Sequence, residues 1–341
     1  MKQKASAPLG LIACLTGGFE FVGRNLWLVI PPVLLDLFLW LGPRLSVASL
    51  VEDFVRLMSG TPTPDAATAQ QLNQAIGLLE ELGQQFNLFS VLTGLPLLSI
   101  PSLLVGQLSG AASPLGPVSV VAPRGVFVPL VLLVVLTGCG LLLGTLYLAG
   151  LASRMVAARS STERARLSGP DGQPGPVPTS SLKRWMRATV FAGVLIGAGW
   201  LIVPLWLLVV ALIFMVAPLI GVMFWLFSVG AVAFVLLHML FVIHGVLLGG
   251  RAISRALWES VLLVRTQLGA VVGLVALSFL IYQGLGFVWV LPKGDSWALL
   301  VGMIGNSCIA TGLTAATFVF YQARLPATIE MLRARQIASK A

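Results

Sequence analysis

The segment that decides the fold runs from Ala188 to Gly249 and reads ATVFAGVLIGAGWLIVPLWLLVVALIFMVAPLIGVMFWLFSVGAVAFVLLHMLFVIHGVLLG. It contains no Asp, Glu, Lys or Arg. A helix rises about 1.5 Å per residue, and the hydrocarbon core of a bilayer is about 30 Å thick, so this run is far too long for one span. It predicts two spanning helices, at about 188–213 and 220–249, with a turn near Pro218.

The composition of the whole chain fits the same environment. Of 341 residues, 57% are hydrophobic and only 10% are charged, whereas a soluble domain has about 25% charged residues. So few polar groups cannot cover a surface that faces water, but they suit a chain dissolved in lipid. We therefore expect an all-α, polytopic integral membrane helix bundle in which residues 1–341 form a single membrane domain.

Four further apolar runs have the character of spanning helices, which brings the predicted number to six. These runs cover residues 24–45, 126–152, 267–291 and 297–321. The first contains Pro31-Pro32, which predicts a kink or a broken first turn, because proline cannot donate a backbone hydrogen bond.

Two segments between the spans have a different character. Residues 46–125 are predicted to form an extracytoplasmic segment, in which an amphipathic helix over 66–87 precedes an apolar stretch at 87–110. Pro96 and Pro101 favour a re-entrant or interfacial conformation for that stretch, although a further span remains the alternative. Residues 154–187 are rich in Gly, Pro and Ser at their centre, which is typical of a flexible cytoplasmic loop.

The distribution of basic residues predicts the orientation. If both termini, the 154–187 loop and residues 251–265 lie on one side, that side holds 17 Lys and Arg and the other holds 4. Basic loops stay in the cytoplasm, so we expect a bacterial inner-membrane protein with cytoplasmic N- and C-termini. A span at 87–110 would move the basic loop outside, which argues against it. Leu11-Ile-Ala-Cys14 also fits a bacterial lipobox, and lipidation at Cys14 is an open alternative. The basic excess is explained by the membrane, and nucleic-acid binding is not expected.

Polar residues inside apolar runs are the candidates for a substrate path. Asp36 is the acid that lies well inside such a run, and an ionised acid in hydrocarbon needs a partner or water. Gln283, Asn306 and Thr314 occupy the last two spans, where a polar seam is expected to point inward. A path for a small molecule is one interpretation, and hydrogen bonding that ties helices together is the other.

The two histidines, His238 and His244, are low-ranking candidates for cofactor ligands. They are six residues apart, about 240° around a helix, so they cannot share one metal. Either could ligate a haem or pigment on its own. The simpler interpretation gives His238 an interhelical hydrogen bond and places His244 at the cytoplasmic interface. The cysteines Cys14, Cys139 and Cys308 form no metal-binding pattern. We expect no metal and no cofactor.

Two further features concern partners. Arg251, Arg255 and Arg265 lie in a short basic amphipathic segment, which is expected to contact anionic lipids. Four GxxxG pairs predict close helix packing, either within the bundle or with other membrane subunits or a second copy. They begin at Gly140, Gly193, Gly245 and Gly269. The chain has no HExxH, GxSxG or Walker A motif, so an enzyme is not expected.

Two stretches carry a family resemblance. They are GFEFVGRNLWLVI at 18–30 and RALWESVLLVRTQLGAVV at 255–272. Each is a short amphipathic helix that ends in Arg and a polar residue and leads into a span. This arrangement resembles the polytopic bacterial family related to the membrane domain of glycerophosphoryl diester phosphodiesterases. The resemblance implies a membrane domain that assists transport or envelope functions, without the phosphodiesterase activity.

Three functional hypotheses follow. The first is a non-enzymatic scaffold or accessory subunit of a membrane assembly, because packing motifs are many and chemical motifs are absent. The second is a transporter or permease component for a small molecule or lipid, built around Asp36 and Asn306. The third is a cofactor-binding membrane subunit that ligates through histidine.

Overall fold

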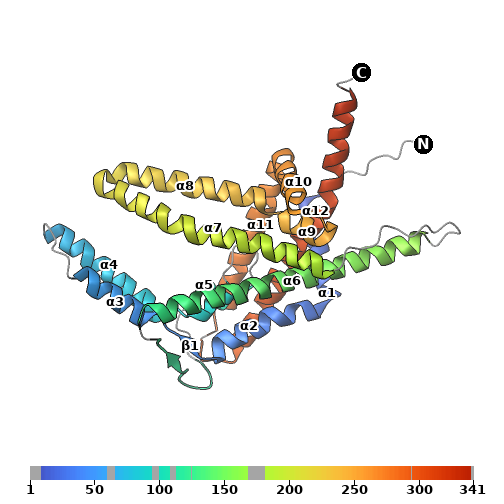
Figure 1. Ribbon diagram of the computed structural model, residues 1–341. Helices are drawn as coiled ribbons and strands as arrows, with labels where there is room; N and C mark the ends of the chain where they lie inside the picture. The colour runs from blue at the N-terminus through green and yellow to red at the C-terminus, as the bar shows by residue number, and fades with distance from the viewer. Residues whose placement is uncertain are drawn as a thin grey trace. The chain divides into compact units, whose positions relative to one another are not determined.

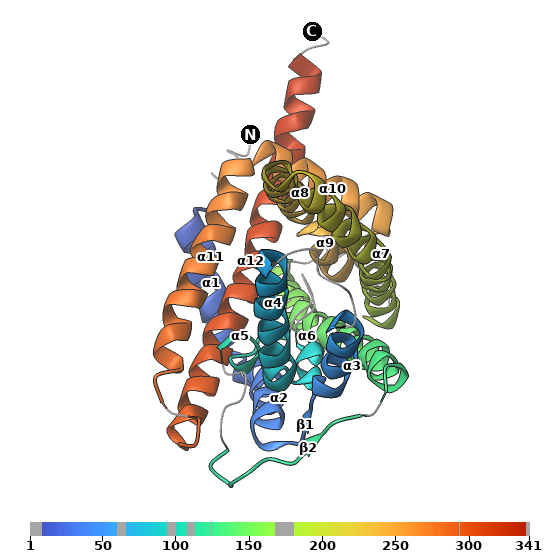
Figure 2. The same ribbon diagram turned by 90° about the vertical axis from the view of Figure 1, so that its left-hand side faces the viewer.

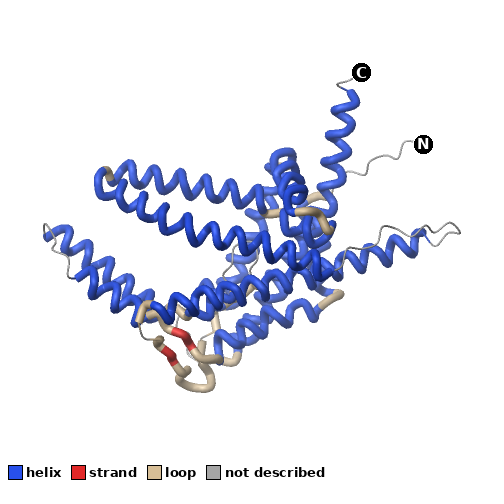
Figure 3. The backbone as a smooth tube through the Cα atoms, in the orientation of Figure 1, coloured by secondary structure: helices blue, strands red, loops and turns tan. Residues whose placement is uncertain are grey.

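The computed structural model describes residues 9–59, 66–93, 100–107, 113–123, 125–167, 181–292 and 294–338. Nearly all of this part of the chain that belongs to a regular element is helical (Figure 3). Its one sheet pairs β1 (Arg44–Leu45) with β2 (Val120–Val121), which run parallel over two residues each. The predicted all-α class is confirmed, whereas this small sheet was not predicted.

Five helical segments are long and apolar enough to cross a membrane. They are α6 (Phe127–Leu167), α7 (Ser181–Val216), α8 (Pro218–Met239) continued by α9 (Val242–Gly249), α11 (Leu268–Trp289) and α12 (Ala298–Ala338). A sixth span results if α1 (Leu11–Gly23) and the segment Leu26–Leu41, which lie on either side of a short break, cross together. The chain is therefore a multi-pass helical membrane protein with five or six spans.

The first predicted span is broken where the prolines suggested. It consists of the 3-10 helix η1 (Leu26–Val29) and α2 (Ile30–Leu41). Pro31 and Pro32 lie in the first turn of α2, where the missing N–H groups have no intrahelical partner to lose. The described helix is consequently only 12 residues long, too short to cross the hydrocarbon core without η1 and α1.

Several helices extend beyond the apolar runs that predicted them. Residues 154–167 belong to α6 and residues 181–187 to α7, although the sequence had suggested a flexible loop from 154 to 187. Residues 168–180 of that loop lie outside the described residues. α12 likewise continues past 321 to Ala338. Ala, Arg and Glu are strong helix formers, so a helix need not end where the hydrocarbon core ends.

The chain divides into two compact units, each of which is described by itself. Unit 1 comprises Met1–Arg24, Thr145–Phe279 and Gly312–Ala341. Unit 2 comprises Asn25–Gly144 and Leu280–Thr311.

In unit 1, α7 and α8 form an antiparallel hairpin (Figure 1), and α7 also contacts α9. The turn lies at Ala217, between Val216 and Pro218, as predicted. Gly221 lets α8 approach the Phe214 ring of α7 closely. Beyond α9, the chain turns at Gly250, whose φ of 61° favours glycine, and α10 (Ile253–Thr266) packs back against α8 and α9.

In unit 2, α3 (Ala48–Ser59) and α4 (Ala66–Gln85) lie side by side (Figures 1 and 2). The amphipathic helix predicted at 66–87 is thus present as α4, while α3 was not predicted. Within the stretch 87–110, the described residues form only the 3-10 helix η2 (Leu88–Leu92) and the four-residue helix α5 (Leu104–Gln107). A re-entrant or interfacial position for this stretch stays a prediction.

Two apolar clusters form the core of unit 2. The first joins Trp40 to Leu103, Leu299 and Met303, all buried, and the Trp40 indole also donates to the carbonyl of Gly294 at 2.8 Å. The second contains Leu45, Leu88, Leu92 and Leu136. The first cluster brings α5 against α2 and the start of α12, which places a polar group of α2 beside the backbone of α5.

Candidate functional site

The buried carboxylate of Asp36 binds the chain just before α5. Asp36 lies on α2 with no exposed surface. Its Oδ1 accepts a hydrogen bond from the Ser102 hydroxyl, and its Oδ2 accepts one from the backbone N–H of Leu103 at 3.0 Å. The Ser102 oxygen in turn accepts from the N–H of Leu104 at 3.2 Å. Together these groups satisfy N–H groups at the start of α5 that have no partner within the helix.

Polar groups from the last two spans extend this cluster. The Tyr282 hydroxyl donates to the carbonyl of Ser102 at 2.8 Å and lies close to Asp36 and Asn306. Asn306 is 1% exposed, and its Nδ2 is buried without a hydrogen-bond partner in the described structure. An unsatisfied buried N–H group costs about 1–3 kcal/mol, so this amide marks the one incomplete position in the cluster formed by Asp36, Ser102, Tyr282 and Asn306.

The four residues of the predicted substrate path have different environments. Asp36 and Asn306 belong to unit 2 and to the same polar cluster. Gln283 is exposed on α11. Thr314 is half-buried on α12 and belongs to unit 1. The structure therefore unites two of the four, and it adds Ser102 and Tyr282. Ser102 had a detectable sequence signal, because a serine before an apolar stretch is a typical N-cap.

The hydrogen bonds of the two histidines differ from those expected. His244 is buried in unit 1, where Nδ1 lies 3.1 Å from the Leu240 carbonyl and Nε2 lies 2.8 Å from the Thr317 hydroxyl. Nδ1 donates to the carbonyl, and Nε2 faces the Thr317 hydroxyl, so neither nitrogen faces an open ligand position. His238, expected to bridge helices, instead bonds through Nδ1 to the carbonyl of Phe234 on its own helix, at 2.8 Å.

Metal-binding geometry is absent from the part of the chain that the structure describes, where no group of three or more His, Cys, Asp or Glu side chains gathers. The three cysteines are free. Cys14, the residue of the lipobox pattern, has no exposed surface.

A second polar cluster surrounds Glu259 of α10, in unit 1. Glu259 is 3% exposed. Its Oε1 lies 3.1 Å from Nε of Arg255 and 3.6 Å from Nε of Arg251, and its Oε2 accepts from the Tyr321 hydroxyl at 3.3 Å. One buried carboxylate thereby fixes two arginines. The sequence showed the spacing of these charges but not the burial of the acid.

The first turns of α7 add further basic groups to this region. Nη1 of Arg187 donates to the carbonyl of Gly250 at 3.0 Å, and Nη1 of Arg184 donates to the carbonyl of Leu247 at 3.2 Å. Both acceptors lie at the C-terminal end of α9, where helix carbonyls lack intrahelical partners and favour cations. Arg265, the third arginine predicted to contact lipid, is exposed at the other end of α10.

Some glycines of the GxxxG pairs pack against neighbouring atoms, whereas others have open space beside them. A Cβ on Gly140 would lie 2.9 Å from the Leu92 carbonyl oxygen, and one on Gly245 would lie 2.8 Å from the Tyr321 hydroxyl. These two glycines therefore serve packing within their own units. A Cβ on Gly197 of α7 would meet nothing within 4 Å, and Gly193 is exposed.

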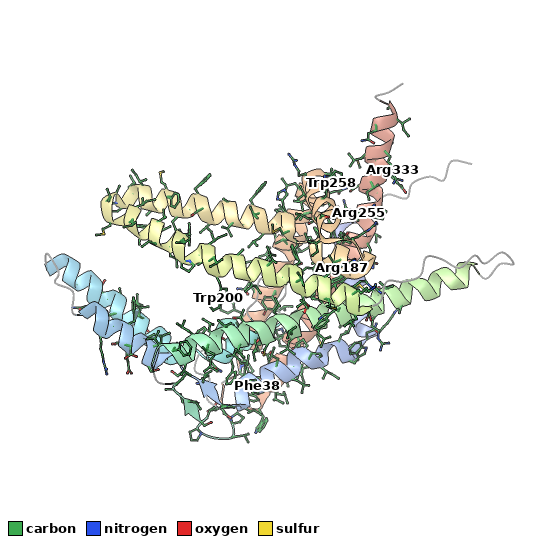
Figure 4. The ribbon with its side chains drawn as sticks, viewed as in Figure 1. Phe38, Arg187, Trp200, Arg255, Trp258 and Arg333 are labelled. Atoms are coloured by element: carbon green, nitrogen blue, oxygen red, sulfur yellow. The ribbon has the colours of Figure 1, made fainter. Side chains whose placement is uncertain are left out.

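Trp200, labelled in Figure 4, follows Gly197 by three residues, and this spacing puts both on the same face of α7. It is 40% exposed, and its indole makes no hydrogen bond within the described residues. Trp206 on the same helix contrasts with it, because its Nε1 donates to the Ser228 hydroxyl of α8 at 3.0 Å. We call the face that carries Gly193, Gly197 and Trp200 the α7 face. Among the described residues, no helix packs on its open Gly197 position and no acceptor binds its indole N–H.

No protein-family model, curated protein or solved structure matches the chain. Kinship with the phosphodiesterase membrane domain therefore stays a prediction.

Proposed function

We propose that the protein is a non-enzymatic accessory subunit of a bacterial inner-membrane assembly, and that the α7 face packs against a transmembrane helix of another subunit. The observation that carries the proposal is the open position at Gly197 beside the Trp200 indole, which has no hydrogen-bond partner among the described residues. Both termini lie in the cytoplasm in this proposal, which the 17-to-4 distribution of Lys and Arg supports.

The proposal depends on small residues and an indole because exposed apolar side chains alone do not make helices associate in lipid. Lipid chains are as apolar as leucine, so helices associate through close packing at small residues and through hydrogen bonds. Exposed leucines on α7 and α8 are satisfied by lipid. Lipid does not satisfy the indole N–H of Trp200, near the middle of α7, because the hydrocarbon core offers no hydrogen-bond acceptor. A partner helix supplies both an acceptor and a surface that fits the glycines.

Purification in a mild detergent, followed by mass spectrometry of the intact complex, tests this function. We expect the wild-type chain to retain a second protein, and Gly197→Leu to lose it, because the leucine fills the open position. Gly269→Leu is the matched control, since a Cβ on Gly269 of α11 also meets nothing within 4 Å. A wild-type chain that is purified without another protein, or equal retention by both variants, would overturn the proposal.

A second candidate function rests on Asn306. Its Nδ2, which has no hydrogen-bond partner among the described residues, lies near Tyr282 and favours a small polar ligand within unit 2, as expected of a permease component. Asn306→Leu should then abolish transport while the protein still folds. Ser278→Ala on α11 is the control, because it also removes a buried hydroxyl without a partner in the described structure. Unchanged flux in Asn306→Leu would rule the candidate out.

A further inference from the structure

We infer that Arg187, Arg251 and Arg255 form a binding site for the phosphate group of an anionic phospholipid. These residues, here called the arginine cluster, all belong to unit 1. They come from the start of α7, the α9–α10 link and the first turn of α10. This site is independent of the α7 face and of any protein partner.

The two arginines of the α9–α10 region are held side by side. Nε of each approaches the same oxygen, Oε1 of Glu259. Among the described residues, each of these ion pairs is formed through Nε, so the terminal guanidinium nitrogens can bind a further acceptor, and the Arg255 side chain is 67% exposed. Guanidinium groups bind phosphate oxygens through pairs of parallel hydrogen bonds, so two of them held on one carboxylate oxygen can serve the same phosphate.

Arg187 completes the cluster at the position next to Arg251. Its Nη1 is anchored on the carbonyl of Gly250, the residue that precedes Arg251, and the side chain is exposed. From residue 181 to residue 267 the chain contains six Lys and Arg but only one acid, Glu259. Since that acid is buried beneath the arginines, the outward-facing charge is positive.

The surroundings favour a lipid over a soluble phosphate. Trp258 follows Arg255 by one turn and is 65% exposed, and Met186 precedes Arg187 and is 53% exposed. Figure 4 labels Trp258 and Arg255 together on α10. A tryptophan beside arginines is typical of the headgroup level of a membrane, where acyl chains cover the apolar side chains and phosphates face the basic ones.

Lipid binding by the purified protein tests the site. The protein is incorporated into nanodiscs of mixed phosphatidylglycerol and phosphatidylcholine, and the lipids retained after release are counted by native mass spectrometry. We expect preferential retention of phosphatidylglycerol, with apparent affinity falling roughly five-fold for each arginine removed in Arg251→Gln and Arg255→Gln. Arg333→Gln removes the same charge from an exposed position near the end of α12 and should leave retention unchanged.

The Glu259→Gln variant distinguishes a structured binding site from a surface that attracts anionic lipid only by its net charge. It raises the net positive charge by one, so a patch that merely accumulates charge would bind phosphatidylglycerol more tightly. A site that depends on the carboxylate to hold both arginines binds it more weakly, which is the expected result. Tighter binding by Glu259→Gln, or equal losses in Arg333→Gln and Arg255→Gln, would overturn the inference.

Two further measurements on the wild-type protein complete the test: competition by inorganic phosphate and the comparison of the two lipids. Inorganic phosphate at millimolar concentration should not displace phosphatidylglycerol from the wild-type protein, and full displacement would assign the site to a soluble anion instead. If the arginine variants fail to fold, the wild-type protein alone decides. Equal retention of phosphatidylglycerol and phosphatidylcholine would contradict the site.

Discussion

The carboxylate of Asp36 lies 3.0 Å from the backbone N–H of Leu103, and both residues are buried. This hydrogen bond, with that from the Ser102 hydroxyl, explains why an acid occupies an apolar run. The first turn of α5 needs acceptors for its N–H groups, and water is scarce in an apolar core. Asp36 supplies them.

Replacing Asp36 should therefore destabilise the protein. Asp36→Leu leaves the Leu103 N–H and the Ser102 hydroxyl without an acceptor, and we expect a loss of about 2–4 kcal/mol in the free energy of unfolding. Denaturation in mixed micelles measures it. Glu52→Gln, on the exposed face of α3, should change stability by less than about 0.5 kcal/mol. If Asp36→Leu is as stable as the wild-type protein, the carboxylate has no such structural role.

Gly18 of α1 should tolerate no side chain. A Cβ at this position would lie 2.5 Å from the backbone nitrogen of Ala316 and the carbonyl oxygen of Gly312, both on α12. Backbone atoms cannot rotate aside, so Gly18→Ala should cost about 3 kcal/mol. Gly23, at the end of the same helix, has nothing within 4 Å of its Cβ position, and Gly23→Ala should be neutral. Thermal unfolding in detergent compares the two, and equal melting temperatures would contradict the close approach of α1 and α12.

The two histidines should differ sharply. His244→Ala removes a ring that packs 4.1 Å from Phe318 and leaves the Thr317 hydroxyl without this partner. We expect a loss of about 2–4 kcal/mol. His238→Ala, which removes a bond within its own helix, should change stability by less than about 1 kcal/mol. A visible absorption spectrum of the wild-type protein should show no haem or pigment band. Such a band, lost in His244→Ala, would restore the cofactor hypothesis.

The orientation predicted from the basic residues can be tested with single cysteines. In a background without Cys14, Cys139 and Cys308, Ser254→Cys on α10 should react with an impermeant maleimide only after the cytoplasmic side is exposed. Ser119→Cys, in the segment that contains β2, should react in intact cells. Both positions are exposed. The opposite pattern of labelling would reverse the proposed topology.

The fold was predictable where hydrophobicity decides it. The run 188–249 predicted the α7–α8 hairpin and its turn, which lies at Ala217, because lipid selects helices of a fixed length. The helical extensions of α6 and α12 were not predictable from apolar length, since helix propensity rather than hydropathy sets their ends. The break within the α8–α9 span at Leu240–Phe241 had no proline or glycine to indicate it.

The candidate site was predictable only in part, because burial and pairing depend on tertiary contacts. Asp36 and Asn306 attracted attention as polar residues in apolar runs, and both belong to one cluster. Their partner Ser102 is 66 residues from Asp36, and no local pattern links them. Glu259 follows Arg255 by four residues, a spacing typical of an exposed ion pair, but the acid is buried and bonds to Tyr321, which is 62 residues away.

Photo-crosslinking in intact cell membranes tests the central claim, that the α7 face packs against another subunit, most directly. A photoreactive residue replaces Val194, which is exposed beside Gly193 and Gly197, and the control position is Val272, exposed on α11. The proposal predicts a crosslinked product with another protein from position 194 and none from position 272. Products with lipid alone, or a crosslink only to a second copy of this chain, would contradict it.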